Sequence, residues 1–472
     1  MRLARPAVAA AVVAALAASG AGARRTPDLA PAASVAVVSI RPDAAHAVAE
    51  PLNTPPSTAF CEQRYRIACY RPAQIQQAFN LPPLYREGVT GQGQTVVIVD
   101  SFGSPTVRRD LAAFDRGAGL PPPPSLKVIQ PAGKVPAYRP TSNREGWAGE
   151  TDLDVEYAHA IAPAASILLV ETPTSENEGT TGFPQIVTAE KYVINHRLGG
   201  VISQSFSATE QTFPSKRSLL NLRGAYTDAA SKGVTVLAAS GDSGAADLRF
   251  NESTYFLHPV TSWPDSDPLV TGVGATELHL DAAGHNVRPA TVWNDTYDQA
   301  ADEFVAGNQG PAPLASGGGT SVIFGRPAFQ NGLRVVGDRR GVPDISMSGA
   351  CNGGADIYQS FAGQPAGWYP TCGTSEATPE FAGIVALADQ VAGHPLGVIN
   401  SSLYRLAARH APGIVDVTSG NTTVSFRQGG RLHTVRGFPA RPGYDLASGV
   451  GTVNAFWLVP ELAQAAGRPA RG

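Results

Sequence analysis

A serine at the start of an apolar helix is the strongest candidate for chemistry in this chain of 472 residues. The segment Thr371–Pro379 reads TCGTSEATP, and the apolar run FAGIVALA follows it closely. The first N–H groups of a helix lack partners within the helix, so they stabilise negative charge that develops beside them. Ser375 in such a turn could act as a nucleophile. The commoner role of a serine or threonine before a helix is a simple cap, so the rest of the chain must supply partners.

No histidine is placed to activate this serine. The usual base is a histidine, but none of the nine histidines follows the strand-like run that ends at Asp100 in a His-Gly-Thr-His setting. Carboxyls offer another base. The segment Gly149–Ile161 reads GETDLDVEYAHAI, and helical spacing places Glu150 and Asp154 on one partly apolar face. Two carboxyls one turn apart can share a proton, so one of them can act as a base below neutral pH.

The remaining charged residues of this segment fall on the opposite side of the helix. Asp152, Glu156 and His159 lie there, and we expect His159 to be a surface residue that points away from the pair. Four acidic residues so close together usually mark a solvated helix surface. A carboxylate on a partly apolar stripe is costly unless it is used, which favours a functional role for Glu150 and Asp154.

Alternating strands and helices must position these groups. Apolar, β-branched runs predict strands at 95–100, 166–170, 201–203 and 234–239. Helical spacing predicts helices at 150–162, 186–196 and 217–232. This order is typical of an α/β fold with a parallel sheet covered on both faces. Ligands bind at the carboxyl ends of such strands, where Asp100, Ser203–Ser205 and Ser240–Asp242 lie. We expect residues 250–345 to be rich in loops.

The chain ends and the composition narrow the class of protein. Arg2 and Arg5 precede an apolar run and Ala21–Ala23, which predicts a secretory signal peptide over residues 1–23. Residues 24–60 are interpreted as a disordered leader or short pro-segment, and 461–472 as a C-terminal tail. The net charge of −3 argues against nucleic acid as a partner. We also expect no membrane partner and a monomer.

Four cysteines fit an oxidising compartment outside the cytosol. They allow three pairings, of which the local one, Cys61 with Cys69 and Cys351 with Cys372, is the simplest. The second bridge would staple the loop that runs into Ser375. Cys372 could instead be a reactive thiol.

Several motifs, in order across residues 61–460, resemble those of the sedolisins. They are Glu150–Asp154, Ser240–Gly244, Ser316–Gly319, Pro343-Asp344, and Gly373–Ser375 with Pro379. The sedolisins are serine-carboxyl peptidases. The resemblance implies one peptidase domain with a subtilisin-like three-layer α/β fold, in which helices flank a central, mostly parallel sheet.

The resemblance also implies a role for each site residue. Ser375 would attack the peptide carbonyl while Glu150 takes its proton, and Asp154 would orient Glu150. Asp242, which can donate a hydrogen bond only when protonated, would form the oxyanion hole with the backbone N–H of Ser375. The implied activity is that of a secreted endopeptidase that cuts protein or peptide substrates at acidic pH.

Two C-terminal loops resemble the calcium loops of the same family. The implied ligands of one structural Ca²⁺ are the carboxylates of Asp416 and Asp445 with the backbone carbonyls of Val417, Arg441 and Gly443. Such an oxygen-only set suits Ca²⁺.

The sequence departs from the family at several places, and two of these, the altered Ser205–Ser207 motif and the short 24–60 segment, favour a second function. Cys372 replaces a small residue, Ser205–Ser207 reads SFS in place of Ser-Trp-Gly, and residues 24–60 are too few for a large folded propeptide. The alternative is a catalytically silent secreted binding protein on the same fold. A His-dependent subtilisin-type enzyme or esterase would need a placed histidine, and Ser375 lacks the Gly-x-Ser-x-Gly setting. Asp100 either extends the proton-sharing network to Glu150 or is an ordinary carboxylate at a strand end.

Overall fold

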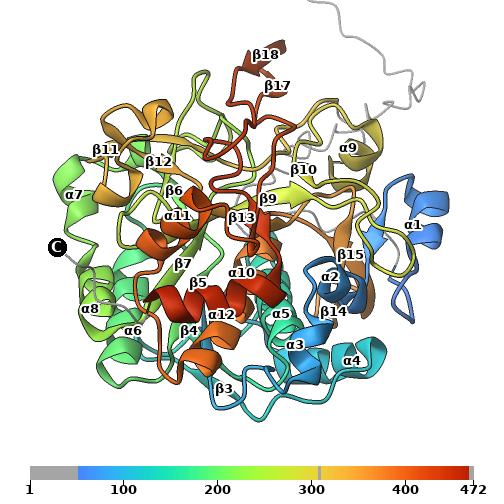
Figure 1. Ribbon diagram of the computed structural model, residues 1–472. Helices are drawn as coiled ribbons and strands as arrows, with labels where there is room; N and C mark the ends of the chain where they lie inside the picture. Colours follow the sequence, from blue (N-terminus) through green and yellow to red (C-terminus); the bar gives the residue numbers. More distant parts are fainter. Residues whose placement is uncertain (1–50, 307–309, 467–472) are drawn as a thin grey trace, which may run out of the picture. The chain divides into compact units, whose positions relative to one another are not determined.

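The structure, a computed structural model, describes residues 51–306 and 310–466. The predicted signal peptide, most of the predicted leader and the last six residues of the predicted tail lie outside the described residues. The central element is an eight-stranded sheet of order β10-β9-β7-β5-β2-β4-β3, with β13 paired to β9 (Figure 1). Its strands are β2 (Thr95–Ser101), β3 (Leu126–Ile129), β4 (Ser166–Thr172), β5 (Val201–Gln204), β7 (Thr235–Ala239), β9 (Thr271–Glu277), β10 (Thr291–Val292) and β13 (Ile345–Ser348).

Helices cover both faces of this sheet, because its strands are apolar on both sides (Figure 1). One face carries α4 (Val107–Ala118), α5 (Ser142–Ile161), α10 (Thr374–Ala392) and α12 (Ala455–Ala466). The other carries α6 (Phe183–Asn195) and α8 (Gly224–Lys232). In β2, Val96 and Ile98 join the first core while Val97 and Val99 join the second. Only β10 runs antiparallel to its neighbour, so the predicted three-layer α/β fold with a mostly parallel sheet is confirmed for the described residues.

The predicted strands at 95–100, 166–170, 201–203 and 234–239 are confirmed as β2, β4, β5 and β7. The helix predicted from residue 150 begins earlier, at Ser142, because Thr141 caps it by accepting a hydrogen bond from the Arg144 N–H at 3.4 Å. The helix predicted over 217–232 is two helices, α7 (Lys216–Leu220) and α8, separated by Asn221–Arg223.

The segment predicted to be rich in loops, 250–345, also contributes two strands to the central sheet. β9 reads TGVGATE, and its two glycines and two threonines conceal a strand that β7 and β13 enclose. The segment further contains α9 (Gln299–Ala306) and the pair β11 (Gly319–Gly325) and β12 (Arg339–Val342).

Smaller elements surround the main sheet. The short helices are α1 (Thr58–Tyr65), α2 (Pro72–Ala78), α3 (Pro82–Arg86) and α11 (Asn400–Ala408). A three-stranded sheet joins β1 (Cys69–Tyr70), β14 (Gly354–Gln359) and β15 (Gly367–Thr371), and a hairpin joins β17 (Val424–Gln428) and β18 (Arg431–Val435). The remaining strands have two residues each and are β6 (Ala208–Thr209), β8 (Ser262–Trp263), β16 (Ile414–Val415) and β19 (Thr452–Val453).

The described end of the predicted leader is ordered and attached to the domain. Leu52 exchanges backbone hydrogen bonds with Trp368, at 3.2 and 2.8 Å, and Ser57 caps α1. The predicted boundary at residue 60 therefore falls inside an ordered segment, since α1 spans it. Cys61 and Cys69 form a disulfide, which confirms the first predicted pairing.

Candidate active site

Helices α5 and α10 pack against each other and bring Glu150 and Ser375 together. Gly383 of α10 permits this close packing, because a Cβ at that position would lie 2.6 Å from the Cβ of Ile161. Glu150 and Ser375 are both buried, and the Ser375 hydroxyl faces the Glu150 carboxyl. Within the described residues, Ser375 Oγ has no partner of strict hydrogen-bond geometry.

The carboxyl pair of α5 lies in a setting that retains protons. Burial raises the pKa of Glu150 well above its usual range, and the charges of Asp100 and Asp242 raise it further. Burial also raises the pKa of Asp154, with added repulsion from Asp100 and Glu150. Burial and mutual repulsion therefore both favour retention of protons by this pair.

Ser205 is a site residue whose contacts the sequence did not predict. It follows β5, and its Oγ donates to Asp154 Oδ1 at 2.7 Å and lies 3.4 Å from the backbone oxygen of Ser375. It therefore orients one member of the carboxyl pair. Its position after a central strand was the available signal, because polar groups gather at that end of a parallel sheet.

Asp242 lies beside the nucleophile turn. Its Oδ1 accepts hydrogen bonds from the backbone N–H and from the hydroxyl of Thr374, both at 2.7 Å. Its Oδ2 has no partner among the described residues and lies against Gly373, where a Cβ would be 2.6 Å away. Burial raises the pKa of Asp242 to about 6, although the bonds from Thr374 lower it. Below that pH the unpaired Oδ2 can carry a proton and donate it to a developing oxyanion.

Asp100 is the penultimate residue of β2 and lies close enough to the carboxyl pair for its charge to act on both members. Burial raises the pKa of Asp100 to about 7, with a lowering contribution from Thr151. Its charge acts on both Glu150 and Asp154. Neither of its oxygens has a partner of strict geometry in the part of the chain that the structure describes. Asp100 is therefore coupled to the pair through charge.

The prediction that His159 is a surface residue is wrong. Its side chain is fully buried, with Nε2 at 2.9 Å from the Pro121 oxygen and 3.2 Å from Asp115 Oδ1. Asp152 and Glu156 on the same side are also buried, and Glu156 accepts a hydrogen bond from the backbone of β14. Helix α4 and strand β14 cover this side of α5, so four acidic residues that suggest a solvated helix lie in the core. His159 does point away from Ser375, as expected.

A disulfide holds the loop in front of the nucleophile. Cys351 and Cys372 are bonded, which confirms the second predicted pairing, and no described cysteine is free. The Gly373 N–H also donates to the Gly349 oxygen at 2.9 Å. The turn that carries Ser375 is thus attached to the segment between β13 and β14.

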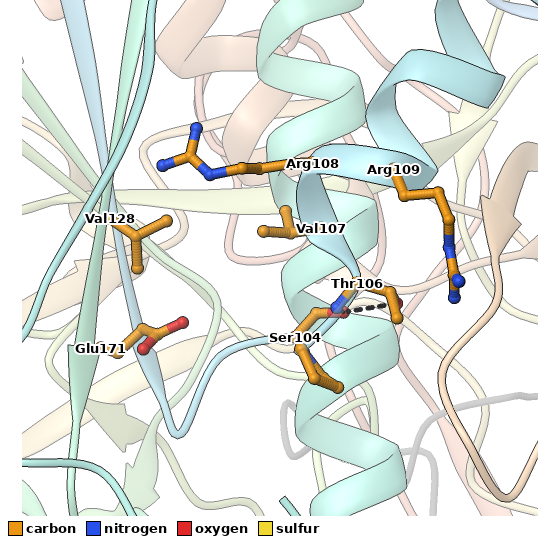
Figure 2. A pocket seen from close by; sticks show the side chains of 8 residues that line it. Ser104, Thr106, Val107, Arg108, Arg109, Val128 and Glu171 are labelled. Carbon is orange, nitrogen blue, oxygen red and sulfur yellow. Dashed lines mark hydrogen bonds between the residues drawn. The ribbon is translucent and has the colours of Figure 1, made fainter. Parts of the chain in front are cut away.

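A cavity of about 430 Å³ opens beyond the end of β2. Figure 2 shows Arg108 and Arg109 diverging from the start of α4, with Glu171 across the cavity from Val107. Glu171 is the register partner of Asp100, so the cavity lies along the same carboxyl edge of the sheet as the carboxyl pair. The cavity is lined by both positively charged side chains, Arg108 and Arg109, and the negatively charged Glu171. The remaining lining residues are Ser104, Pro105, Thr106 and Val128.

The structure brings the two predicted calcium loops together. The Gly443 N–H donates to Asp416 Oδ2 at 2.8 Å, and the Arg441 N–H donates to Asp445 Oδ2 at 2.6 Å. Among the described residues, no three His, Cys, Asp or Glu side chains are grouped to hold a metal ion. An ion at this position would take its further ligands from backbone carbonyls, such as that of Val417. With two carboxylates and several carbonyls in one loop pair, the residues fit an oxygen-only cation site.

Comparison with known proteins gives consistent results. A model of the subtilase family matches residues 141–429. The chain is 30% identical to kumamolisin of Bacillus sp. (strain MN-32) over 401 residues, covering 83% of this chain and 63% of that protein. It is 29% identical to sedolisin of Pseudomonas sp. (strain 101) over 371 residues, covering 77% of this chain and 57% of that protein. The chain thus spans about three fifths of the length of these relatives.

A solved structure supports the same relationship. Pseudomonas sedolisin, a serine-carboxyl proteinase complexed with two molecules of pseudo-iodotyrostatin, matches with a TM-score of 0.69 and 25% sequence identity. The match covers 84% of this chain and 99% of that chain. Because the family match extends over more than half of the chain and includes both α5 and the nucleophile turn, the chain belongs to the subtilase family and, within it, to the sedolisins.

Proposed function

We propose that the protein is a secreted serine-carboxyl endopeptidase that hydrolyses peptide bonds at acidic pH. The observation that carries this proposal is the juxtaposition of a buried serine hydroxyl at a helix start, a buried carboxyl that it faces, and a second buried carboxyl with an unpaired oxygen. These are Ser375, Glu150 and Asp242. The predicted signal peptide and the two disulfides support export.

Each group has a step in the reaction. Ser375 Oγ attacks the peptide carbonyl while Glu150 takes the hydroxyl proton, and Asp154, itself held by the Ser205 hydroxyl, orients Glu150 and shares its proton. The tetrahedral oxyanion receives hydrogen bonds from protonated Asp242 and the Ser375 backbone N–H. Glu150 then returns the proton to the leaving amine, which yields an acyl-enzyme. Water then attacks the acyl-enzyme while Glu150 takes a proton from it. This proton returns to Ser375 Oγ when the second tetrahedral intermediate collapses.

The pH range of activity follows from the two carboxyl roles. Glu150 must share or lose its proton to act as a base, whereas Asp242 must keep its proton to donate to the oxyanion. Since the pKa of Asp242 is raised to about 6, loss of its proton should reduce activity above that pH. The low-pH limit is set by complete protonation of the Glu150–Asp154 pair.

The test is digestion of a denatured protein substrate from about pH 3 to 8, a range that spans carboxyl and imidazole titration. Wild type is compared with Ser375→Ala and Glu150→Gln. Glu156→Gln is the matched control, since Glu156 is a buried carboxyl on the other side of the same helix. We expect activity limited to acid pH, lost in both site variants and kept in the control, with internal cuts in the substrate.

Two results would refute this proposal. Neutral activity that survives Glu150→Gln would indicate a different base. A folded wild-type protein without activity at any pH would indicate a catalytically silent binding protein.

We also propose that one Ca²⁺ binds between the loops that carry Asp416 and Asp445. Asp445 Oδ1 already accepts backbone hydrogen bonds from Ala447 and Ser448, each at 2.9 Å, which gives its loop a defined shape. A cation bound by both carboxylates would tie the two loops together. Its role would be structural, because these loops contain none of the groups proposed for catalysis.

A further inference from the structure

A second group of buried carboxyls lies next to the nucleophile and is not used by the proposed reaction. Glu376 directly follows Ser375, and Glu380 lies one turn further along α10. At about 100° per residue, these two glutamates share a helix face that is turned away from the Ser375 side chain. Asp356 of β14 faces the same space. All three carboxyls are fully buried.

The segment between β13 and β14 holds this group against the nucleophile turn. Glu380 Oε2 accepts the N–H of Ser348 at 3.2 Å, and Glu376 faces the Ser348 side chain and the Ala355 N–H. The same segment is joined to the nucleophile turn by the Cys351–Cys372 disulfide and the Gly349–Gly373 hydrogen bond described above. The carboxyl cluster therefore fills the space between the turn and the segment that supports it.

The cluster has many acceptors and little positive charge. Both oxygens of Glu376, both of Asp356 and one of Glu380 have no partner of strict geometry in the described residues. From α5, Tyr157 faces all three carboxyls, and its hydroxyl donates to the backbone oxygen of Asp356 at 3.2 Å. The cation that acts on Asp356 is Arg71, whose guanidinium is also bonded to the oxygens of the 55–56 segment.

Protonation of the cluster therefore decides whether it holds the turn or disturbs it. Burial raises the pKa of Glu376 to about 8 and those of Glu380 and Asp356 well above their usual values. A protonated carboxyl supplies the donor that the unpaired oxygens lack. An ionised one leaves an uncompensated charge beside a second carboxyl, in a space with little solvent.

We propose that Asp356, Glu376 and Glu380 are positioning residues whose shared protons keep the turn bearing Ser375 ordered at acid pH. Loss of these protons loosens that turn and reduces activity further, at a higher pH than the loss of the Asp242 proton and independently of the Glu150–Asp154 pair. The expected change in the pH profile of activity rests on the proposed peptidase function. The expected change in the order of the turn does not. A plain packing role would not depend on the protons. Under the proposal, replacing a glutamate by glutamine, which has the same shape but no charge, should remove the pH dependence and keep the packing.

The kinetic test compares pH profiles of kcat/KM, each normalised to its own maximum, for wild type and Glu376→Gln. We expect wild-type activity to fall more steeply above about pH 8, where Glu376 loses its proton in addition to Asp242. Glu376→Gln should keep the shallower slope, so that its normalised activity near pH 9 exceeds that of wild type by up to about tenfold. The matched control is Glu190→Gln, which neutralises a buried carboxyl on α6 across the sheet. An unchanged high-pH slope in Glu376→Gln, or an equal change in Glu190→Gln, would overturn the proposal.

The structural test uses the inactive Ser375→Ala protein, so it does not depend on peptidase activity. Hydrogen exchange of the backbone amides of residues 374–378 and 380, corrected for intrinsic rates, is measured at about pH 5 and about pH 9, on either side of the pKa of about 8 of Glu376. We expect protection to fall by roughly tenfold or more at the higher pH, and to fall much less when Glu380→Gln is added. Protection that is independent of pH would overturn the proposal even if the protein is a peptidase. A catalytically silent protein that still shows the pH-dependent loss would refute only the proposed function.

Discussion

Glu190→Gln should stabilise the fold at neutral pH while changing little at acid pH. Glu190 lies on α6 and is fully buried against the sheet. One of its oxygens accepts a hydrogen bond from Gln204 Nε2, and the other has no partner among the described residues. The substitution keeps the shape and an acceptor for Gln204 but removes the ionisable proton.

The size of the effect follows from the pKa of this carboxyl. Burial raises the pKa of Glu190 from 4.5 to about 8. Because the folded value is the higher one, its stabilising contribution is fully present below pH 4.5 and is lost as the pH rises toward about 8. At about pH 7.5 the unfolded chain has released the proton and the folded chain has not, which costs about 4 kcal/mol at 1.36 kcal/mol per unit.

The assay is urea unfolding followed by tryptophan fluorescence, in the Ser375→Ala background to prevent self-digestion. We expect the free energy of unfolding of Glu190→Gln to exceed that of its parent by up to about 4 kcal/mol near pH 7.5, and to differ by less than about 1 kcal/mol near pH 4. Glu62→Gln, at an exposed glutamate, is the control and should show neither effect. A stability difference that is the same at both pH values would show that burial does not hold this proton.

Three further predictions concern stability. Replacing both Cys351 and Cys372 by serine opens a loop with a sequence separation of 21 residues, and should lower the free energy of unfolding by about 3 kcal/mol; a chemical denaturation curve identical to wild type would contradict this. Asp344→Asn should cost about 3–5 kcal/mol in the same assay, because it leaves the fully buried Arg340 guanidinium without its charged partner, now bonded at 2.7 Å. Added Ca²⁺ should raise the melting temperature of wild type but not of Asp416→Asn, and equal melting of wild type with and without a chelator would refute the calcium proposal.

The sequence predicted those strands whose own side chains explain why they are strands. β2, β4, β5 and β7 are continuous β-branched or apolar runs, because strands buried on both faces need such residues throughout. β9 was not predicted, since Gly272 and Gly274 have little strand preference of their own. That strand exists because β7 and β13 supply hydrogen-bond partners on both sides. Pairing of this kind joins residues distant in sequence and leaves no local pattern.

Motif spacing was enough to propose candidate site residues, whereas their surroundings could not be predicted from the sequence. Helical periodicity correctly placed Glu150 and Asp154 on one face of α5, and strand order placed Ser205 and Asp242 at the same edge of the sheet. Periodicity could not show that the opposite face is buried too, because that depends on α4 and β14 packing over it. The misplacement of His159 is the direct result.

At the nucleophile, local sequence established a serine in the first turn of an apolar helix, because helix starts and apolar spacing are local properties. Tertiary structure decided what surrounds that turn. It placed the buried carboxyls of Glu150 and Asp242 near Ser375, and a second carboxyl cluster with Glu376 and Glu380 next to the same turn. The burial of these groups comes only from the packing of distant segments. It raises their pKa values, so these carboxyls keep their protons to a higher pH than exposed carboxyls do.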